Sequence, residues 1–216
     1  MTSAPQAIGD RLPGWYGKLP GTGDFAHRRL PNSFLTNWDA WLLQGFHNLR
    51  IARPDWAQRF LVSPVWFFIL GRDVVDPSQW MGILMPSVDS AGRYFPLTLA
   101  IELNEDTLEI SAEKASGFLC WWAVSAKLAV VGLNDDMDAG QFDTLLHREF
   151  LPHRESTIPT HSTMRLCARG ESSWIKQPLE SHSGDLSVVG LPTGLSFNSL
   201  FDCAPVFDRD SDEVTT

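Results

Sequence analysis

The stretch VWFFILGRDVVDPSQWMGILMPSVDSAGRYFPLTLAIEL, residues 65–103, decides the fold. It contains three apolar runs, at residues 65–70, 80–85 and 94–103, separated by segments rich in Gly, Pro, Asp and Ser. Near-continuous apolar runs of this length, bounded by turn residues, are typical of buried β-strands. The stretch therefore predicts three buried strands of one sheet.

Segments of helical periodicity lie on both sides of this stretch. The predicted helices cover residues 31–45, 55–61, 105–131 and 141–150, with Gly45 and Gly132 as expected stops. Shorter strands are expected at residues 14–19, 163–168, 173–176 and 186–189, and a last amphipathic segment at residues 195–201. This mixed order is not a βαβ alternation. It predicts a single-domain α+β fold, with a central and mainly antiparallel sheet flanked by helices.

The two ends of the chain differ from its middle. Residues 1–10 are small and polar, and residues 206–216 are mostly polar and acidic. Such segments contribute little to a core and are typical of flexible tails. The domain is therefore expected to span residues 11–205.

Composition excludes several classes of protein. The chain has 216 residues, 44% of them hydrophobic, and a formal net charge of −9, which argues against a disordered chain and against a nucleic-acid binder. Residues 1–100 hold nine basic and seven acidic groups, whereas residues 101–216 hold eight and 19. No apolar run is long enough to predict membrane insertion, and the N-terminus does not resemble a signal peptide. Three Cys without a CxxC motif favour a reducing cytoplasm and give no metal site.

Catalytic motifs are missing from the sequence. It contains no GxSxG elbow, no Walker loop and no HExxH pair. The six His are scattered and do not repeat at a ligand spacing. No catalytic residue, metal or cofactor is therefore predicted.

The first candidate site is a basic cluster around the turn GTGD at residues 21–24. Its charged members are Lys18, Asp24, His27, Arg28 and Arg29. Adjacent Arg28 and Arg29 cannot both face inward on a regular element, so at least one should face solvent or pair with an acid. Two interpretations stay open: an Arg–Asp ion pair that fixes the turn, or a surface whose guanidinium groups contact an anion or a partner.

The second candidate site is the segment PSVDSAGR at residues 86–93. Asp89 and Arg93 lie four residues apart across Gly92, between two predicted strands. This spacing predicts a turn held by an Asp89–Arg93 ion pair, with a partner-facing loop as the alternative. Ser87 has no base near it in the sequence and is a poor candidate for a nucleophile.

Four segments together resemble a known protein family. They are GWYGKLPGTGDFAHRRLPNSFLTNWDAWL (residues 14–42), SPVWFFIL (63–70), MGILMPSVDSAGRYFPLTLA (81–100) and SWIK…GLP…F (173–197). In content, order and spacing they are similar to the TagF family, also called ImpM, of bacterial type VI secretion accessory proteins. One departure is Phe67, which stands where the family pattern has Arg in a WRF triplet.

The resemblance implies an α+β fold of the longin or profilin kind and a regulatory role without catalysis. TagF-like proteins act in the cytoplasm as post-translational repressors or modulators of type VI secretion, alongside a forkhead-associated scaffold protein and a threonine-phosphorylation pathway. No cofactor is implied. Charged and polar residues at positions that match the family motifs form the candidate partner-binding set: Lys18, Asp24, Arg28, Arg29, Asp39, Ser87, Asp89 and Arg93.

These observations predict a non-catalytic cytoplasmic accessory protein that modulates the apparatus by binding its components. Two alternatives remain: a structural component of the apparatus, and a small phosphate-handling hydrolase using Asp24, Asp89 and Arg93. Metal-dependent turnover of a phosphoester that is lost in Asp24→Asn would identify the hydrolase. The sequence does not predict the oligomeric state or the direct partner.

Overall fold

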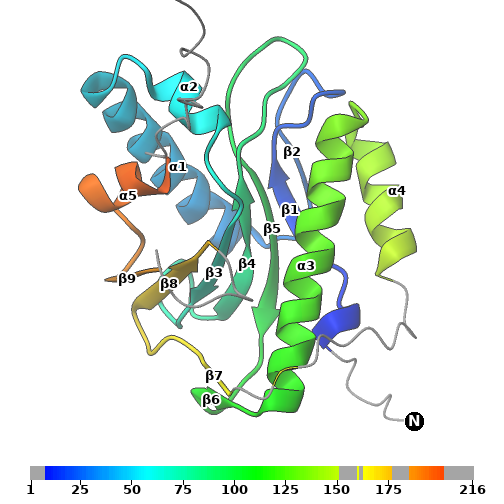
Figure 1. Ribbon diagram of the computed structural model, residues 1–216, viewed down its shortest axis with the longest axis vertical. Helices are drawn as coiled ribbons and strands as arrows, with labels where there is room; N and C mark the ends of the chain where they lie inside the picture. Colours follow the sequence, from blue (N-terminus) through cyan, green and yellow to red (C-terminus); the bar gives the residue numbers. More distant parts are fainter. Residues whose placement is uncertain (1–7, 151–159, 161–162, 177–184, 202–216) are drawn as a thin grey trace, which may run out of the picture.

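The computed structural model describes residues 8–150, 160, 163–176 and 185–201. These residues form a seven-stranded sheet with helices on both faces (Figure 1). In chain order the elements are η1 (Ile8–Asp10), β1 (Gly14–Gly17), β2 (Ala26–Arg28), α1 (Asn32–Ala52), α2 (Trp56–Leu61), β3 (Trp66–Leu70), β4 (Gln79–Met85), β5 (Leu97–Leu103), β6 (Glu109–Ile110), α3 (Ala112–Asn134), α4 (Ala139–Glu149), β7 (Met164–Arg165), β8 (Glu171–Ile175), β9 (Leu186–Val189) and α5 (Leu195–Leu200).

The predicted α+β class with an antiparallel sheet is confirmed. The strand order is β2-β1-β5-β4-β3-β8-β9, and every described pair is antiparallel. The three strands predicted from residues 65–103 are β3, β4 and β5 at the centre. All but one of their residues are buried, because helices cover both faces, and this two-sided burial explains the apolar runs.

The two faces of the sheet carry cores of different composition. Alternate strand residues point to opposite faces, so Ile83 and Leu99 pack with α3 and α4, whereas Phe68 and Trp80 pack with α1, α2 and α5. The face that α1, α2 and α5 cover is rich in aromatic rings. Eight of the nine Trp are buried, and only Trp56 is partly exposed.

Phe67, the departure from the family pattern, belongs to the core on the α3 side. Its ring lies 5.6 Å from that of Trp122, at an interplanar angle of 66°. Only 9% of Phe67 is exposed. An edge-to-face aromatic contact therefore fills the position where the family pattern has Arg.

The prediction that Gly45 ends the first helix was wrong, because α1 continues to Ala52. A Cβ added at Gly45 would lie 2.2 Å from the ring of Phe197, a residue of α5. The missing side chain therefore gives α5 space to pack against α1, and it does not mark a stop. The close approach of another element to a helix and the end of a helix both favour Gly, so the sequence alone does not distinguish the two.

The start of the long helix was also predicted too early. Residues 105–110 include β6, which pairs with β7, and α3 begins only at Ala112. Ser111 is its N-cap and accepts a 3.4 Å hydrogen bond from the backbone N–H of Lys114. Gly132 lies inside the helix, where a Cβ would be 2.6 Å from the ring of Phe142 in α4.

The terminal segments predicted as tails fall largely outside the described residues, which omit 1–7 and 202–216. Within residues 1–10, Ile8–Asp10 form η1, which packs on α3. Helix α3 is long and apolar enough to cross a membrane by length and composition, although the sequence analysis expected no such segment. Its apolar side chains pack on the sheet, as in the core helix of a globular protein.

Candidate interaction surface

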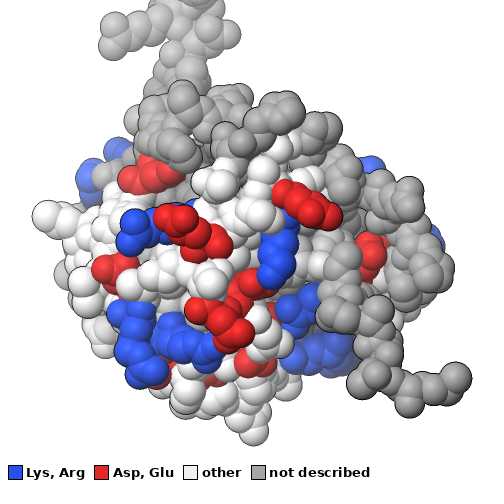
Figure 2. All heavy atoms as spheres, turned by 90° about the horizontal axis from the view of Figure 1, so that it is seen from below, with Lys and Arg blue, Asp and Glu red and all other residues white. Residues whose placement is uncertain are grey.

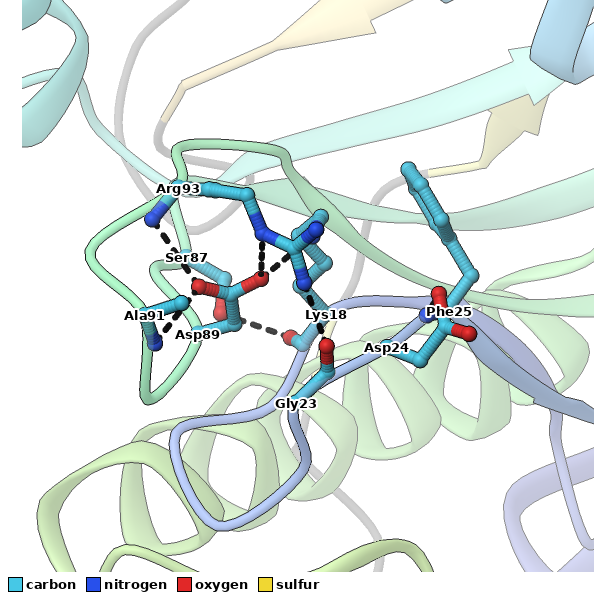
Figure 3. A network of polar contacts seen from close by, with 8 residues as sticks. All are labelled: Lys18, Gly23, Asp24, Phe25, Ser87, Asp89, Ala91 and Arg93. Atoms are coloured by element: carbon cyan, nitrogen blue, oxygen red, sulfur yellow. Dashed lines mark hydrogen bonds and ion pairs between the residues drawn. The ribbon is translucent and has the colours of Figure 1, made fainter.

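The two candidate loops of the sequence analysis meet at one end of β1 and β5 (Figure 3). Asp89 lies at the centre of the contact, and its side chain is completely buried. Its carboxylate accepts hydrogen bonds from the Lys18 ammonium and from the Arg93 guanidinium, whose Nε lies 2.8 Å away. The backbone N–H groups of Ala91 and Arg93 donate to the other carboxylate oxygen at 3.0 and 2.9 Å. We call Lys18, Ser87, Asp89 and Arg93 the Asp89 network.

The donors around Asp89 determine its charge state. Burial alone would raise the pKa of this carboxyl, because a low-dielectric surrounding disfavours the charged form. The hydrogen bonds from Lys18 and Arg93 outweigh burial and hold the pKa of Asp89 well below its ordinary value. The carboxylate is therefore ionised at neutral pH, and its oxygens are occupied by structural donors.

The Asp89 network joins segments that are distant in the chain. The Ser87 hydroxyl donates to the Lys18 carbonyl at 2.7 Å, and the Arg93 guanidinium also donates to the carbonyl of Gly23. The turn at residues 21–24 is held on its other side by the α3–α4 connection, where Gly21 N–H donates to Met137 O at 3.2 Å. The predicted Asp89–Arg93 pair is therefore confirmed, and it fixes two loops rather than one turn.

An exposed rim lies over this buried network. Residues 23–25 and 90–93 are all exposed, whereas Asp89 beside them is buried. We call these two segments the loop-pair surface. Phe25 is 43% exposed although its ring stacks on Tyr16 and meets Phe95 edge-to-face at 4.7 Å. The Lys18 ammonium lies 4.6 Å from the Phe25 ring centroid. An exposed aromatic ring that packs on two further rings and lies beside an ammonium group is typical of an interface contact.

Arg29, which follows β2 in the chain, takes part in a second cluster together with residues of α4. Its guanidinium donates to Asp143 of α4 at 2.6 Å and to the Pro13 carbonyl at 2.9 Å, and lies 3.4 Å from the ring of His147. The Trp15 indole N–H also donates to Asp143, at 2.9 Å. We call Trp15, Arg29, Asp143 and His147 the Asp143 cluster.

Arg29 holds this position in an unfavourable backbone conformation. Its φ is 61°, in the left-handed region that side chains with a Cβ rarely adopt. Burial would raise the pKa of Asp143, but the hydrogen bonds from Arg29 and Trp15 lower it below its ordinary value. Arg29 therefore attaches α4 to the strand edge, whereas its neighbour Arg28 is exposed, donates to the His27 carbonyl and lies 6.0 Å from the Trp15 ring centroid.

The remaining candidates lie apart from these clusters. Asp39 of α1 accepts a hydrogen bond from the Tyr16 hydroxyl on the aromatic face of the sheet, and burial together with this bond raises the pKa of Tyr16. Asp24 accepts from the N–H of Phe25 at 2.8 Å and is exposed. The structure thus unites Lys18, Ser87, Asp89 and Arg93, but it does not bring Asp24, Arg28, Arg29 or Asp39 into the same network.

Two contributors were missed by the sequence analysis. Phe25 was assigned no role, although an aromatic residue in a turn between Gly and a basic pair is a signal for an exposed contact. Asp143 lies 114 residues from its partner Arg29, in the acidic half, and no local pattern links them. The pair joins the two halves of the chain, which differ in net charge.

Charge and ligand geometry limit what the described surface can bind. Viewed from the β6–β7 end, Lys and Arg side chains alternate with Asp and Glu (Figure 2). Within residues 8–150, 160, 163–176 and 185–201, no group of three His, Cys, Asp or Glu has the geometry for a metal ion. The loop-pair surface, at the other end of the sheet, combines the exposed ring of Phe25 with one acidic residue, Asp24, and one basic residue, Arg93.

Comparison with known proteins gives a family match and a similar solved structure. Residues 14–148 match the family model of the TagF N-terminal domain, described as type VI secretion system-associated. The structure is similar to the crystal structure of PA0076 from Pseudomonas aeruginosa PAO1, with a TM-score of 0.69 and 26% sequence identity over 90% of this chain and 98% of that one. No curated protein matches the chain.

The α+β fold and the match over most of the sheet define the chain as a type VI secretion-associated protein. It belongs to the TagF family. Both loops of the Asp89 network and both members of the Arg29–Asp143 pair lie within the matched residues.

Proposed function

We propose that this protein is a non-catalytic cytoplasmic regulator that represses or modulates assembly of the type VI secretion apparatus by binding one of its components. Its partners are type VI secretion proteins, and a forkhead-associated scaffold protein is the first candidate from the family resemblance. A regulator of this kind lowers the amount of assembly-competent partner by mass action and requires no chemistry.

One observation carries the proposal: a buried ion network holds two exposed loops in a fixed arrangement. Asp89 is saturated by four donors from Lys18, Ala91 and Arg93. The groups left facing solvent include Phe25, which is 43% exposed, and the outer part of Arg93, whose side chain is 56% exposed. Such a preorganised surface loses little conformational entropy when a partner binds.

The geometry favours binding over the hydrolase alternative. Phosphoryl chemistry by Asp24, Asp89 and Arg93 would require carboxylates that can reach a substrate or a metal ion. The Asp89 side chain instead has no exposed surface, and its oxygens are held by Lys18, Arg93 and two backbone N–H groups. Asp24 faces solvent without joining this network. The carboxylates therefore act as turn-forming groups in this proposal.

The test is effector export from a bacterium with an active type VI apparatus that overproduces the protein. The wild-type chain is expected to reduce export. Phe25→Ser combined with Arg28→Glu should restore export, because both side chains are exposed and neither belongs to the Asp89 network. Leu195→Ser combined with Arg165→Glu is the matched control, since these two residues are also exposed and lie elsewhere.

Each result has a distinct meaning. Unchanged export with overproduced wild-type protein would contradict a repressing role. Full repression by the Phe25→Ser, Arg28→Glu variant, at the same folded concentration, would show that neither the exposed ring of the loop-pair surface nor the neighbouring Arg28 is needed for the contact, and would count against that surface. Equal loss of repression in the control variant would attribute the effect to general surface damage and would also count against this surface.

A further inference from the structure

Strand β5 is longer than the part of it that β1 covers. The pairing of β1 with β5 runs from Gly14↔Ala100 to Tyr16↔Thr98, whereas β4 pairs with β5 as far as Leu103. No residue within the described ranges forms a β-pair with residues 101–103 on the β1 side. This segment therefore presents an open edge inside a sheet whose other central strands are paired on both sides.

The sequence determines where β1 ends. Pro13 has no backbone N–H and cannot continue the ladder as a donor. Two residues earlier the chain contacts α3, where the Trp121 indole N–H donates to the Arg11 carbonyl at 2.8 Å. The preceding η1 packs on α3 as well. The open edge is thus a fixed feature of the fold, held by contacts on α3.

A cavity of about 530 Å³ lies along this edge. Its floor includes Gly14 of β1 and residues 100–102 of β5, and its walls include Arg11, Pro31 and Trp80. This volume falls within the range of pockets that hold small ligands or short peptide segments. An extended chain placed there would lie in line with β1 and could continue its hydrogen bonds to β5.

Arg11 supplies a charge that is not paired inside the described structure. It is partly buried, and this burial lowers the pKa of its guanidinium, although Glu102 and Glu105 act in the opposite direction. None of the described carboxylates lies within ion-pair distance of it, and no described residue accepts a hydrogen bond from its side chain. Glu102, which also lines the cavity, accepts a hydrogen bond from the Ser78 hydroxyl at 2.6 Å.

We propose that this cavity binds an extended peptide segment of a partner protein, which adds to the open edge of β5 and places one carboxylate against Arg11. The backbone edge recognises the main chain of the segment, and the guanidinium selects an acidic side chain. Because Glu102 lines the same cavity and repels any carboxylate, the acid is expected on the Arg11 side of the cavity and uncharged residues next to Glu102. The cavity lies at the opposite end of β1 and β5 from the Asp89 network, so this site is separate from the loop-pair surface.

The experiment selects hexapeptides from a random display library on the purified full-length chain and then measures synthetic copies of the selected sequences. Selected peptides should contain Asp or Glu and should shift the amide NMR signals of Ile101, Glu102 and Leu103. Arg11→Glu should weaken their binding by about tenfold or more, the effect of losing a charge-assisted contact worth about 1.4 kcal/mol. The same variant should prefer peptides in which the acid is replaced by Lys.

Two controls separate this site from non-specific attraction. Arg165→Glu changes an exposed arginine outside the cavity and should leave affinity within about twofold. Methylation of the peptide backbone nitrogens should reduce binding at least as strongly as Arg11→Glu, because it removes strand pairing. A library that yields no binders, or binders that shift other amides or ignore Arg11→Glu, would overturn the proposal while leaving the export experiment unaffected.

Discussion

Two charged clusters attach the first motif to the rest of the protein, and they do so in different surroundings. The Asp89 network and the Asp143 cluster each place a carboxylate against an arginine and further donors. Asp89 has no exposed side-chain surface and meets Lys18, whose side chain is 4% exposed, whereas Asp143 and Arg29 are 20% and 28% exposed. Burial, more than the number of hydrogen bonds, should therefore decide how much each cluster contributes to the free energy of unfolding.

The physical reason is the local dielectric. Ion pairs close to water gain little, because solvent competes for both charges and salt screens them. A buried pair is different, since removal of one partner leaves the other charge in a medium that cannot solvate it. We therefore expect substitutions at Asp89 and Asp143 to differ in size and in their response to pH and salt.

The largest effect is expected for Asp89→Asn. This change leaves the Lys18 ammonium buried without its counter-ion and should lower the free energy of unfolding by about 3–5 kcal/mol, as measured by urea denaturation. Asp73→Asn is the matched control, because Asp73 pairs with the exposed Arg169 and Asn tolerates its φ of 64°. Similar losses in both variants would mean that burial does not separate the two kinds of pair.

The acid limb of the stability curve should follow the same division. A carboxyl whose pKa is lower in the folded protein stabilises the fold above its unfolded pKa of about 3.9, and this stabilisation is lost as pH falls. The pKa of Asp89 is held well below its ordinary value, so wild-type stability should fall as pH decreases below about 4. Asp89→Asn should show a shallower acid limb in urea denaturation between pH 7 and 3. Parallel limbs for the two proteins would contradict the charge state assigned to Asp89.

The sequence predicted the Asp89–Arg93 pair because both residues lie in one turn, four positions apart. It could not place Lys18 on the same carboxylate, since that contact joins residues 71 positions apart and depends on the pairing of β1 with β5. The Arg29–Asp143 contact was hidden for the same reason, since its members lie 114 positions apart.

The fold was predictable where a local sequence pattern has a single structural explanation. Apolar runs bounded by turn residues gave β3, β4 and β5, because two-sided burial selects such runs. A glycine in a helical segment can mark the end of the helix or a close contact with another element. Gly45 was therefore wrongly predicted as a helix end, although it leaves space for the ring of Phe197. The open edge of β5 was not predictable, because it depends on where another strand departs from the sheet.

A smaller effect on the free energy of unfolding is expected for substitutions of Arg29. Loss of its hydrogen bonds destabilises the fold, whereas release of its left-handed backbone conformation stabilises it. Arg29→Ala removes the bonds to Asp143 and Pro13 but keeps a Cβ at a φ of 61°. Arg29→Gly removes the same bonds and adopts this φ freely, so it should be more stable than the Ala variant by about 1 kcal/mol. Urea denaturation of the two variants measures the difference. A less stable Gly variant would indicate that the left-handed conformation of Arg29 carries no strain.

The smallest effect, and the one that compares the clusters most directly, is the response to salt. Between about 0.05 and 0.5 M NaCl the Debye length falls from about 14 to about 4 Å, which screens charges that water can reach. The loss of stability caused by Asp143→Asn should therefore shrink by a few tenths of a kcal/mol, because Arg29 is partly exposed. The loss caused by Asp89→Asn should stay constant, since neither Asp89 nor Lys18 is open to solvent ions. Equal salt dependence in both variants would require the Asp89 network to open in solution, and the loops above it could then no longer act as a preorganised surface.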